Sequence, residues 1–139
     1  MVRSFTNSVD TRGEGHVVDL TPSVLELIRR SGVREGTASL FVPGSTAGLT
    51  TIEYEPGALA DLRRAFERLA PAEGDYEHNA RWGDGNGFSH VRSALLRTSL
   101  CVPVSGGRLQ LGTWQQIVVI NFDNRSRDRE VVGIVIGDA

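Results

Sequence analysis

Apolar residues alternate with polar ones in several segments of the chain, which predicts half-buried strands. Residues 2–20 are expected to form two strands around a turn at residues 10–13, and therefore an N-terminal hairpin. Another strand is expected at 38–42, with 49–53 as its continuation or its partner. After residue 100 the pattern is that of strands throughout, and the tight turns between them imply two more hairpins. These later strands are expected at 100–104, 109–111, 114–122 and 131–136.

Other segments have the three- and four-residue spacing of amphipathic helices. One such helix lies between Pro22 and Gly32, and a clearer one lies between Gly57 and Pro71. No periodicity follows until about residue 90, and a stretch that long without a pattern in a small domain favours a functional segment. A short helix is expected to begin near Ser89. Its apolar face would consist of Val91, Ala94 and Leu95.

Strands joined by short turns, with two to three helices among them, indicate an α+β fold. We expect a mainly antiparallel sheet, half-barrel or sandwich-like, in a single domain that spans residues 1–139. Hydrophobic residues make up 40% of the chain, which is enough for a core of its own. The one cysteine, Cys101, stands within a predicted strand and is expected to be a buried, small hydrophobic residue.

Charge and composition remove several classes of function. All 15 basic residues are arginine, so the chain has neither a Schiff-base lysine nor a P-loop lysine. The net charge of -2 lacks the positive excess that binds nucleic acid. Since no apolar run approaches the length of a membrane span, we expect a soluble, cytoplasmic protein with neither a nucleic acid nor a membrane as partner.

Candidate chemistry gathers in the segment without periodicity. His78 and His90 enclose it, and Asp84 and Asn86 lie between them in a glycine-rich loop. Two imidazoles and a carboxylate are ligands that a divalent metal such as zinc accepts. The alternative is that both histidines only form hydrogen bonds within the loop, and the spacing by itself favours this alternative. The glycines would let a tight loop present Asp84 and Asn86 to a ligand, or simply make a surface turn.

A second candidate is the loop at residues 43–48, between two predicted strands. Its backbone N–H groups and the hydroxyls of Ser45 and Thr46 are able to surround an anionic group such as phosphate, although a plain turn explains the pattern equally well. Glu53 follows on the adjoining strand and is a candidate general base or ligand. It would equally suit the solvated face of a strand.

The run Ser99–Ile117, with Gly112-Thr113-Trp114-Gln115 at its core, resembles the signature of the YjbQ family, also known as UPF0047. The resemblance covers most of the chain from about Leu40 onward. It includes Ser45–Thr50 with Glu53, then His78, the loop Asp84–Gly87, His90 and the pair Leu95-Leu96.

This resemblance implies a compact α+β protein, typically a homotrimer, with weak secondary thiamine-phosphate synthase activity. The reaction would join hydroxymethylpyrimidine diphosphate to a thiazole phosphate and release pyrophosphate. Two alternatives remain open: a trimeric module that binds a metal or a phosphorylated metabolite without catalysis, and a purely structural trimer subunit.

The resemblance also implies roles for individual residues. Catalysis is assigned to Glu53, His78 and His90. A divalent metal, zinc or magnesium, would be held by His78, Asp84 and His90. Contacts to a phosphorylated substrate are assigned to Ser45, Thr46, Asn86, Trp114 and Gln115.

Two positions depart from the family pattern. Many relatives have a histidine where this chain has Gly44, and many have one where it has Phe88, so a metal site that used either ligand would be incomplete. Trp114 has an alternative role as a buried anchor, which is the commoner fate of a tryptophan on a strand.

Overall fold

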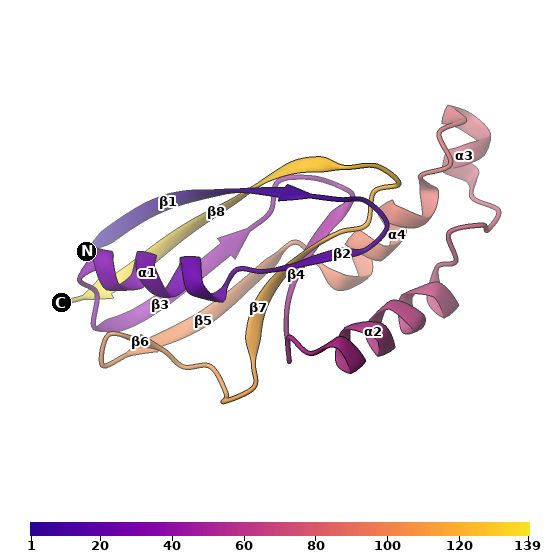
Figure 1. Ribbon diagram of the computed structural model, residues 1–139. Coiled ribbons are helices and arrows are strands. Elements are labelled where there is room, and N and C mark those ends of the chain that lie inside the picture. The colour runs from indigo at the N-terminus through magenta and orange to yellow at the C-terminus, as the bar shows by residue number, and fades with distance from the viewer.

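The computed structural model describes all 139 residues, and it contains two antiparallel sheets and four helices (Figure 1). The larger sheet has the strand order β1-β8-β3-β5-β6, and the smaller has the order β2-β7-β4. The strands are β1 (Val2–Thr11), β2 (His16–Asp19), β3 (Glu35–Phe41), β4 (Ala47–Ile52), β5 (Ser99–Ser105), β6 (Arg108–Leu109), β7 (Gln116–Asn121) and β8 (Arg127–Asp138). The helices are α1 (Thr21–Ser31), α2 (Pro56–Leu69), α3 (Glu77–Trp82) and α4 (Gly87–Leu96).

The predicted α+β class with a mainly antiparallel sheet is confirmed, since every strand pair is antiparallel. The larger sheet is curled, and α1 lies along one of its faces (Figure 1). The segment without periodicity contains one helix that the pattern does not predict, the six-residue α3. A helix this short has too few residues to show an apolar period, which explains why the sequence predicts two to three helices rather than four.

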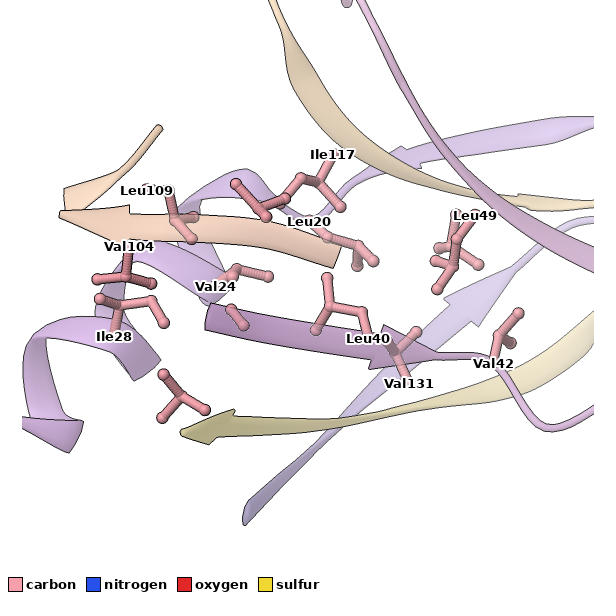
Figure 2. Packing of buried hydrophobic residues seen from close by; sticks show 14 of the residues in the cluster. Leu20, Val24, Ile28, Leu40, Val42, Leu49, Val104, Leu109, Ile117 and Val131 are labelled. Atoms are coloured by element: carbon pink, nitrogen blue, oxygen red, sulfur yellow. The ribbon is translucent and has the colours of Figure 1, made fainter. Parts of the chain in front are cut away.

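The main core lies between the two sheets and α1. Val24 and Ile28 of α1 are each 2% exposed and pack in one cluster with Leu40 of β3 and Val104 of β5 (Figure 2). The smaller sheet contributes Ile117 to the same cluster. The spacing of Val24 and Ile28, four residues apart, puts both side chains on one helix face and explains why α1 packs as it does.

The smaller sheet is buried on both faces. On β7, Ile117 and Val119 face the main core, whereas Val118 and Ile120 face a second cluster built around Phe66 of α2. That second cluster also contains Val17 and Phe122. A strand buried on both faces is apolar without alternation, as residues 117–120 are.

Three predicted strand pairings are wrong. The N-terminal strands form no hairpin, because β1 pairs with β8 and β2 pairs with β7 in the other sheet. Strand β4 is neither a continuation nor a partner of β3, since it pairs with β7. The turn after β7 also crosses between the sheets, so only the β5–β6 hairpin forms as predicted. Alternation shows which face of a strand is buried, but it carries no information about the neighbouring strand.

Helix α4 buries a different face from the one predicted. Val91 and Leu95 are exposed, whereas Arg92 and Ser93 are buried. The buried polar groups are satisfied: Arg92 donates to the Ala70 carbonyl and to Glu67, and the Ser93 hydroxyl donates to the Ala47 carbonyl. Hydrogen bonds have therefore reversed the orientation that hydrophobicity alone favours.

Cys101 is exposed on the outer face of the larger sheet, not buried as predicted. Its Sγ lies 2.8 Å from the Thr37 hydroxyl on the neighbouring strand β3. The period-two pattern puts Val102 and Val104 inside, which necessarily turns Cys101 outward. None of the helices has both the length and the apolarity needed to cross a bilayer.

Candidate functional site

His78 and His90 come together at the contact between α3 and α4. Their ring centroids lie 4.4 Å apart with the planes tilted by 40°. Asp84, in the loop between the two helices, has its Oδ1 atom 3.3 Å from His78 Nδ1. The geometry of this close approach does not make a hydrogen bond, and His78 Nδ1 is buried without another partner. The structure thus brings all three predicted metal donors into one neighbourhood.

The loop that carries Asp84 is held in shape by its own hydrogen bonds. Asp84 Oδ1 accepts from the Asn86 backbone N–H at 3.1 Å, and Asn79 Oδ1 accepts from the Gly87 N–H at 2.8 Å. Gly87 must be glycine, because a Cβ there would stand 2.5 Å from the Tyr76 Cβ. This close contact fixes the start of α4, and therefore His90, against α3.

Asn86 is 7% exposed and uses its side chain inside the protein. Its Oδ1 accepts from the Ser89 hydroxyl at 2.7 Å and from the Asn124 N–H at 3.2 Å. These bonds join the beginning of α4 to the loop between β7 and β8. Asn86 therefore supports the site from the interior of the protein. Its predicted contact with substrate stays a prediction.

Thr46 also faces inward. Its hydroxyl donates to Asp123 Oδ2 at 3.0 Å and accepts from an Arg129 guanidinium nitrogen at 2.7 Å. Asp123 is 1% exposed. Burial works against its ionisation, but hydrogen bonds from Asn86 and Thr46, together with the charge of Arg127, outweigh burial and lower the pKa of Asp123. Asp123 is thus a buried carboxylate that accepts from one candidate loop through Thr46, while its neighbour Asn124 donates to Asn86 of the other.

Beside this network is a polar pocket of about 410 Å³, which we call the His90 pocket. It lies between the loop after β3 and the C-terminal half of α4, and all but one of its lining residues are polar or glycine. The lining consists of Gly44, Ser45, His90, Ser93, Ala94, Arg97, Thr98 and Ser99. Two predicted residues, Ser45 and His90, therefore share one pocket.

Arg97 lines the same pocket, and the sequence analysis does not predict it. Its backbone has φ 83° and ψ 164°, a conformation that is essentially restricted to glycine. The conformation is held on both sides, because the Arg97 N–H donates to the Ser93 carbonyl and its own carbonyl accepts from the Leu49 N–H. The sequence carries one sign of this conformation. Residue 97 directly follows α4, where helices often end in a glycine, and here the residue is an arginine.

Glu53, Trp114 and Gln115 lie elsewhere. Glu53 follows the end of β4, whereas Ser45 precedes its beginning, and a six-residue strand is roughly 20 Å long. Gln115 Nε2 donates to the Thr51 hydroxyl at 3.0 Å, so it also lies at the Glu53 end of β4. Trp114 is 71% exposed, which makes the buried-anchor alternative wrong for the single chain. Within one chain the predicted site is therefore divided between the two ends of β4.

The predicted donors do not complete a metal site within one chain. No group of three or more His, Cys, Asp or Glu side chains is arranged to hold a metal ion. Phe88 is 4% exposed and packs under the Arg92 guanidinium, so a ligand at that position would point into the interior. Gly44 does line the His90 pocket, and the absence of a side chain there leaves room in it. The bound metal stays a prediction.

Comparison with known proteins identifies the family. A family model described as UPF0047 protein YjbQ-like matches residues 6–138. The chain belongs to the YjbQ/UPF0047 family. It is 33% identical to a UPF0047 protein of Methanocaldococcus jannaschii, covering 96% of this chain and 94% of that one. It is 37% identical to a UPF0047 protein of Mycobacterium tuberculosis strain H37Rv, covering 88% and 90%.

Solved structures of the same kind share the fold described above. A hypothetical protein from Aeropyrum pernix K1 superimposes with a TM-score of 0.90 at 31% identity, covering 98% of this chain and 99% of that one. A YjbQ/UPF0047 protein from Clostridium acetobutylicum gives a TM-score of 0.87 at 33% identity, covering 95% and 99%. The two-sheet arrangement that positions the His90 pocket is thus an arrangement of the YjbQ family.

Proposed function

We propose that this YjbQ-family protein binds a phosphorylated small molecule in the His90 pocket and acts on it as a thiamine-phosphate synthase. The observation that carries the proposal is the lining of the pocket, where an arginine and a histidine stand among hydroxyl groups. Phosphate oxygens are recognised by cations and by N–H and O–H donors of this kind. A volume of about 410 Å³ suits a small phosphorylated metabolite.

Four residues of the pocket have a defined part in this proposal. Arg97 supplies a permanent positive charge and up to two parallel hydrogen bonds to phosphate oxygens. Ser45 and Thr98 supply hydroxyl donors to the pocket. His90 supplies an imidazole that would donate a proton to a phosphate oxygen as negative charge develops there.

The reaction would be a substitution at carbon. The thiazole nitrogen attacks the methylene carbon of hydroxymethylpyrimidine diphosphate, so that a C–N bond forms while the C–O bond to the diphosphate breaks. Pyrophosphate leaves with the electron pair of the broken bond. Donors already positioned around the leaving group lower the barrier because they stabilise charge where it develops. In this pocket Arg97 and His90 are the groups that would do so.

Condensation of the two thiamine precursors tests the proposal. Purified protein should form thiamine phosphate and pyrophosphate, and the variants His90→Ala and Arg97→Ala should each lower the rate by about tenfold or more. Arg64→Ala is the matched control, since it also removes an arginine, which is exposed on α2 and lies outside the pocket. Equal rates in the native protein and in the double variant His90→Ala/Arg97→Ala would refute the assigned chemistry.

A second candidate is a binding module without catalysis. The observation that favours it is the position of Glu53, which lies at the far end of β4 and leaves the His90 pocket without a carboxylate base. This candidate predicts binding of a phosphorylated pyrimidine or thiazole with no turnover, and binding should still be weakened by Arg97→Ala. Product formation by the native protein eliminates it.

A divalent metal, zinc or magnesium, is a separate part of the proposal. His78, Asp84 and His90 are its candidate ligands, and the support is their proximity around the buried His78 Nδ1. Elemental analysis of the native protein, with His78→Ala as the comparison, tests it. Stoichiometric metal that is lost in the variant is the expected result, and no metal in the native protein contradicts it.

We further propose a homotrimer in the cytoplasm. Exposed apolar surface supports the trimer, because large exposed apolar patches mostly mark interaction sites. Trp114 and Leu95 are both exposed, and an apolar depression of about 850 Å³ lies on the outer face of the larger sheet beside Phe41 and Ile134. Light scattering on the purified protein should give three times the chain mass. A monomer at all concentrations would contradict the assembly.

A further inference from the structure

Arg129 is a buried cation that lacks an anionic partner. It lies on β8, at an inward-facing position, and is 7% exposed. One terminal nitrogen, Nη2, makes both of its hydrogen bonds, at 2.7 Å to the Thr46 hydroxyl and at 2.6 Å to Asn121 Oδ1. Its Nε atom is fully buried and has no hydrogen-bond partner. Buried charges are normally paired, so an arginine in this state indicates a missing partner.

The charges around Arg129 do not balance. Asp123 is the buried carboxylate nearby, but it is in an ion pair with Arg127 at 3.2 Å and forms none with Arg129. Two guanidinium groups therefore stand beside one carboxylate. Burial lowers the pKa of Arg129, and the charge of Asp123 opposes that effect only in part. An additional negative charge at this place would remove the imbalance.

Gly44 leaves one end of this guanidinium uncovered. A Cβ at residue 44 would stand 3.0 Å from Arg129 Nη1, the terminal nitrogen that makes no hydrogen bond within the chain. Gly44 also lines the His90 pocket. The same glycine thus borders the pocket on one side and the free end of Arg129 on the other.

We infer that Arg129 is an anion-binding residue that takes a phosphate group through the gap at Gly44. The inference rests on the proposed function, because it places one phosphate of the phosphorylated ligand at the rear of the same pocket. Arg129 offers Nη1, which faces Gly44 and has no partner within the chain, whereas Nε is buried on the other side of the guanidinium; Nη2 is already held in place by Thr46 and Asn121. A guanidinium fixed in this way binds a phosphate without losing further side-chain freedom.

Isothermal titration of inorganic phosphate into the whole protein tests the inference. Gly44→Ala is the decisive variant, since its methyl group would cover Nη1 without changing any charge. Gly32→Ala is its matched control for backbone strain, because Gly32 also has a positive φ, 75°, and a Cβ there meets nothing within 4 Å. We expect Gly44→Ala to weaken phosphate binding about tenfold or more, as loss of a charge-assisted hydrogen bond would, and Gly32→Ala to leave it unchanged.

Arg129→Lys provides a second measurement. It keeps the charge but removes the forked donors, so it should also weaken phosphate binding in protein whose circular dichroism is native. Native affinity in Gly44→Ala, or in folded Arg129→Lys, overturns the inference. If Arg97→Ala alone loses affinity, the His90 pocket stands and only the role of Arg129 fails. If Gly44→Ala alone loses affinity, Arg129 stands and the proposed role of Arg97 fails.

Discussion

Replacing Arg97 by glycine should leave the protein more stable than replacing it by alanine, although both changes remove the same charge and the same guanidinium. Arg97 has φ 83° and ψ 164°. A residue with a Cβ costs about 1–3 kcal/mol in this region of conformational space, and alanine retains that cost. Glycine removes it but gains conformational entropy in the unfolded chain, which costs about 0.5–1 kcal/mol.

When the entropy cost is subtracted from the relief of strain, the free energy of unfolding of Arg97→Gly should be about 1 kcal/mol higher than that of Arg97→Ala. In a chain of 139 residues this corresponds to a rise of about 4 °C in Tm. Both variants keep the backbone hydrogen bonds to Ser93 and from Leu49, because neither involves the side chain. The pair therefore isolates the backbone conformation.

Urea unfolding followed by circular dichroism is the assay, and equal slopes against urea are required for the comparison. Phosphate affinity is measured on the same samples and should fall equally in the two variants, since each lacks the guanidinium. If the alanine variant is as stable as the glycine variant, the backbone at residue 97 is not strained. If only one variant loses phosphate affinity, the loss does not come from the missing charge.

Three further predictions concern the interior. Asp123 has a lowered pKa, so its contribution to stability is present above the unfolded-state pKa and is lost as the pH falls through the folded-state value. Asp123→Asn should therefore flatten the acid limb of a plot of Tm against pH below about pH 5. An unchanged acid limb would contradict this. Phe122→Ala should cost about 3–5 kcal/mol in urea unfolding, because it empties the contact with Phe66, whereas exposed Leu69→Ala should cost less than about 0.5 kcal/mol. Thr46→Val should lower the free energy of unfolding by about 1–3 kcal/mol, because Asp123 and Arg129 each lose a hydrogen-bond partner. Ser45→Ala is the control, and equal stability of these two variants would refute the inward-facing role of Thr46.

The parts of the fold that are predictable from the sequence are those that depend on local periodicity. The spacing of Val24 and Ile28 predicts the buried face of α1, and the apolar residues within 114–122 predict a strand where β7 lies. Strand partners are not predictable, since β1 and β2 are adjacent in sequence and yet lie in different sheets. The sheet that each of these strands joins depends on β8 and β7, which come about a hundred residues later in the chain. No local sequence pattern contains that information.

The candidate site is predictable where its residues lie close in sequence around one helix contact. His78, Asp84 and His90 meet because short helices and a tight loop bring them together. Glu53 and Ser45 are only eight positions apart in sequence, which suggests that they lie close together. The residues between them form an extended strand, however, so the two lie beyond opposite ends of β4. Arg129, like Arg97, carries an overlooked signal, in its case a charge at an inward position of the alternating strand β8.

Two residues with predicted contacts to substrate, Thr46 and Asn86, also form hydrogen bonds in the framework beside the pocket. Thr46 donates to Asp123, and Asn86 accepts from the N–H of the next residue, Asn124, so this segment joins the loop before β4 to the start of α4. Ser45 of that loop and His90 of that helix line the His90 pocket, and the segment therefore helps to hold the two in place. Because the same network also holds Arg129, a ligand phosphate bound there would be joined through hydrogen bonds to both walls of the pocket. Binding at Arg129 is then expected to rigidify the walls that carry Ser45 and His90, which connects recognition of the phosphate with the positioning of the groups that act on it.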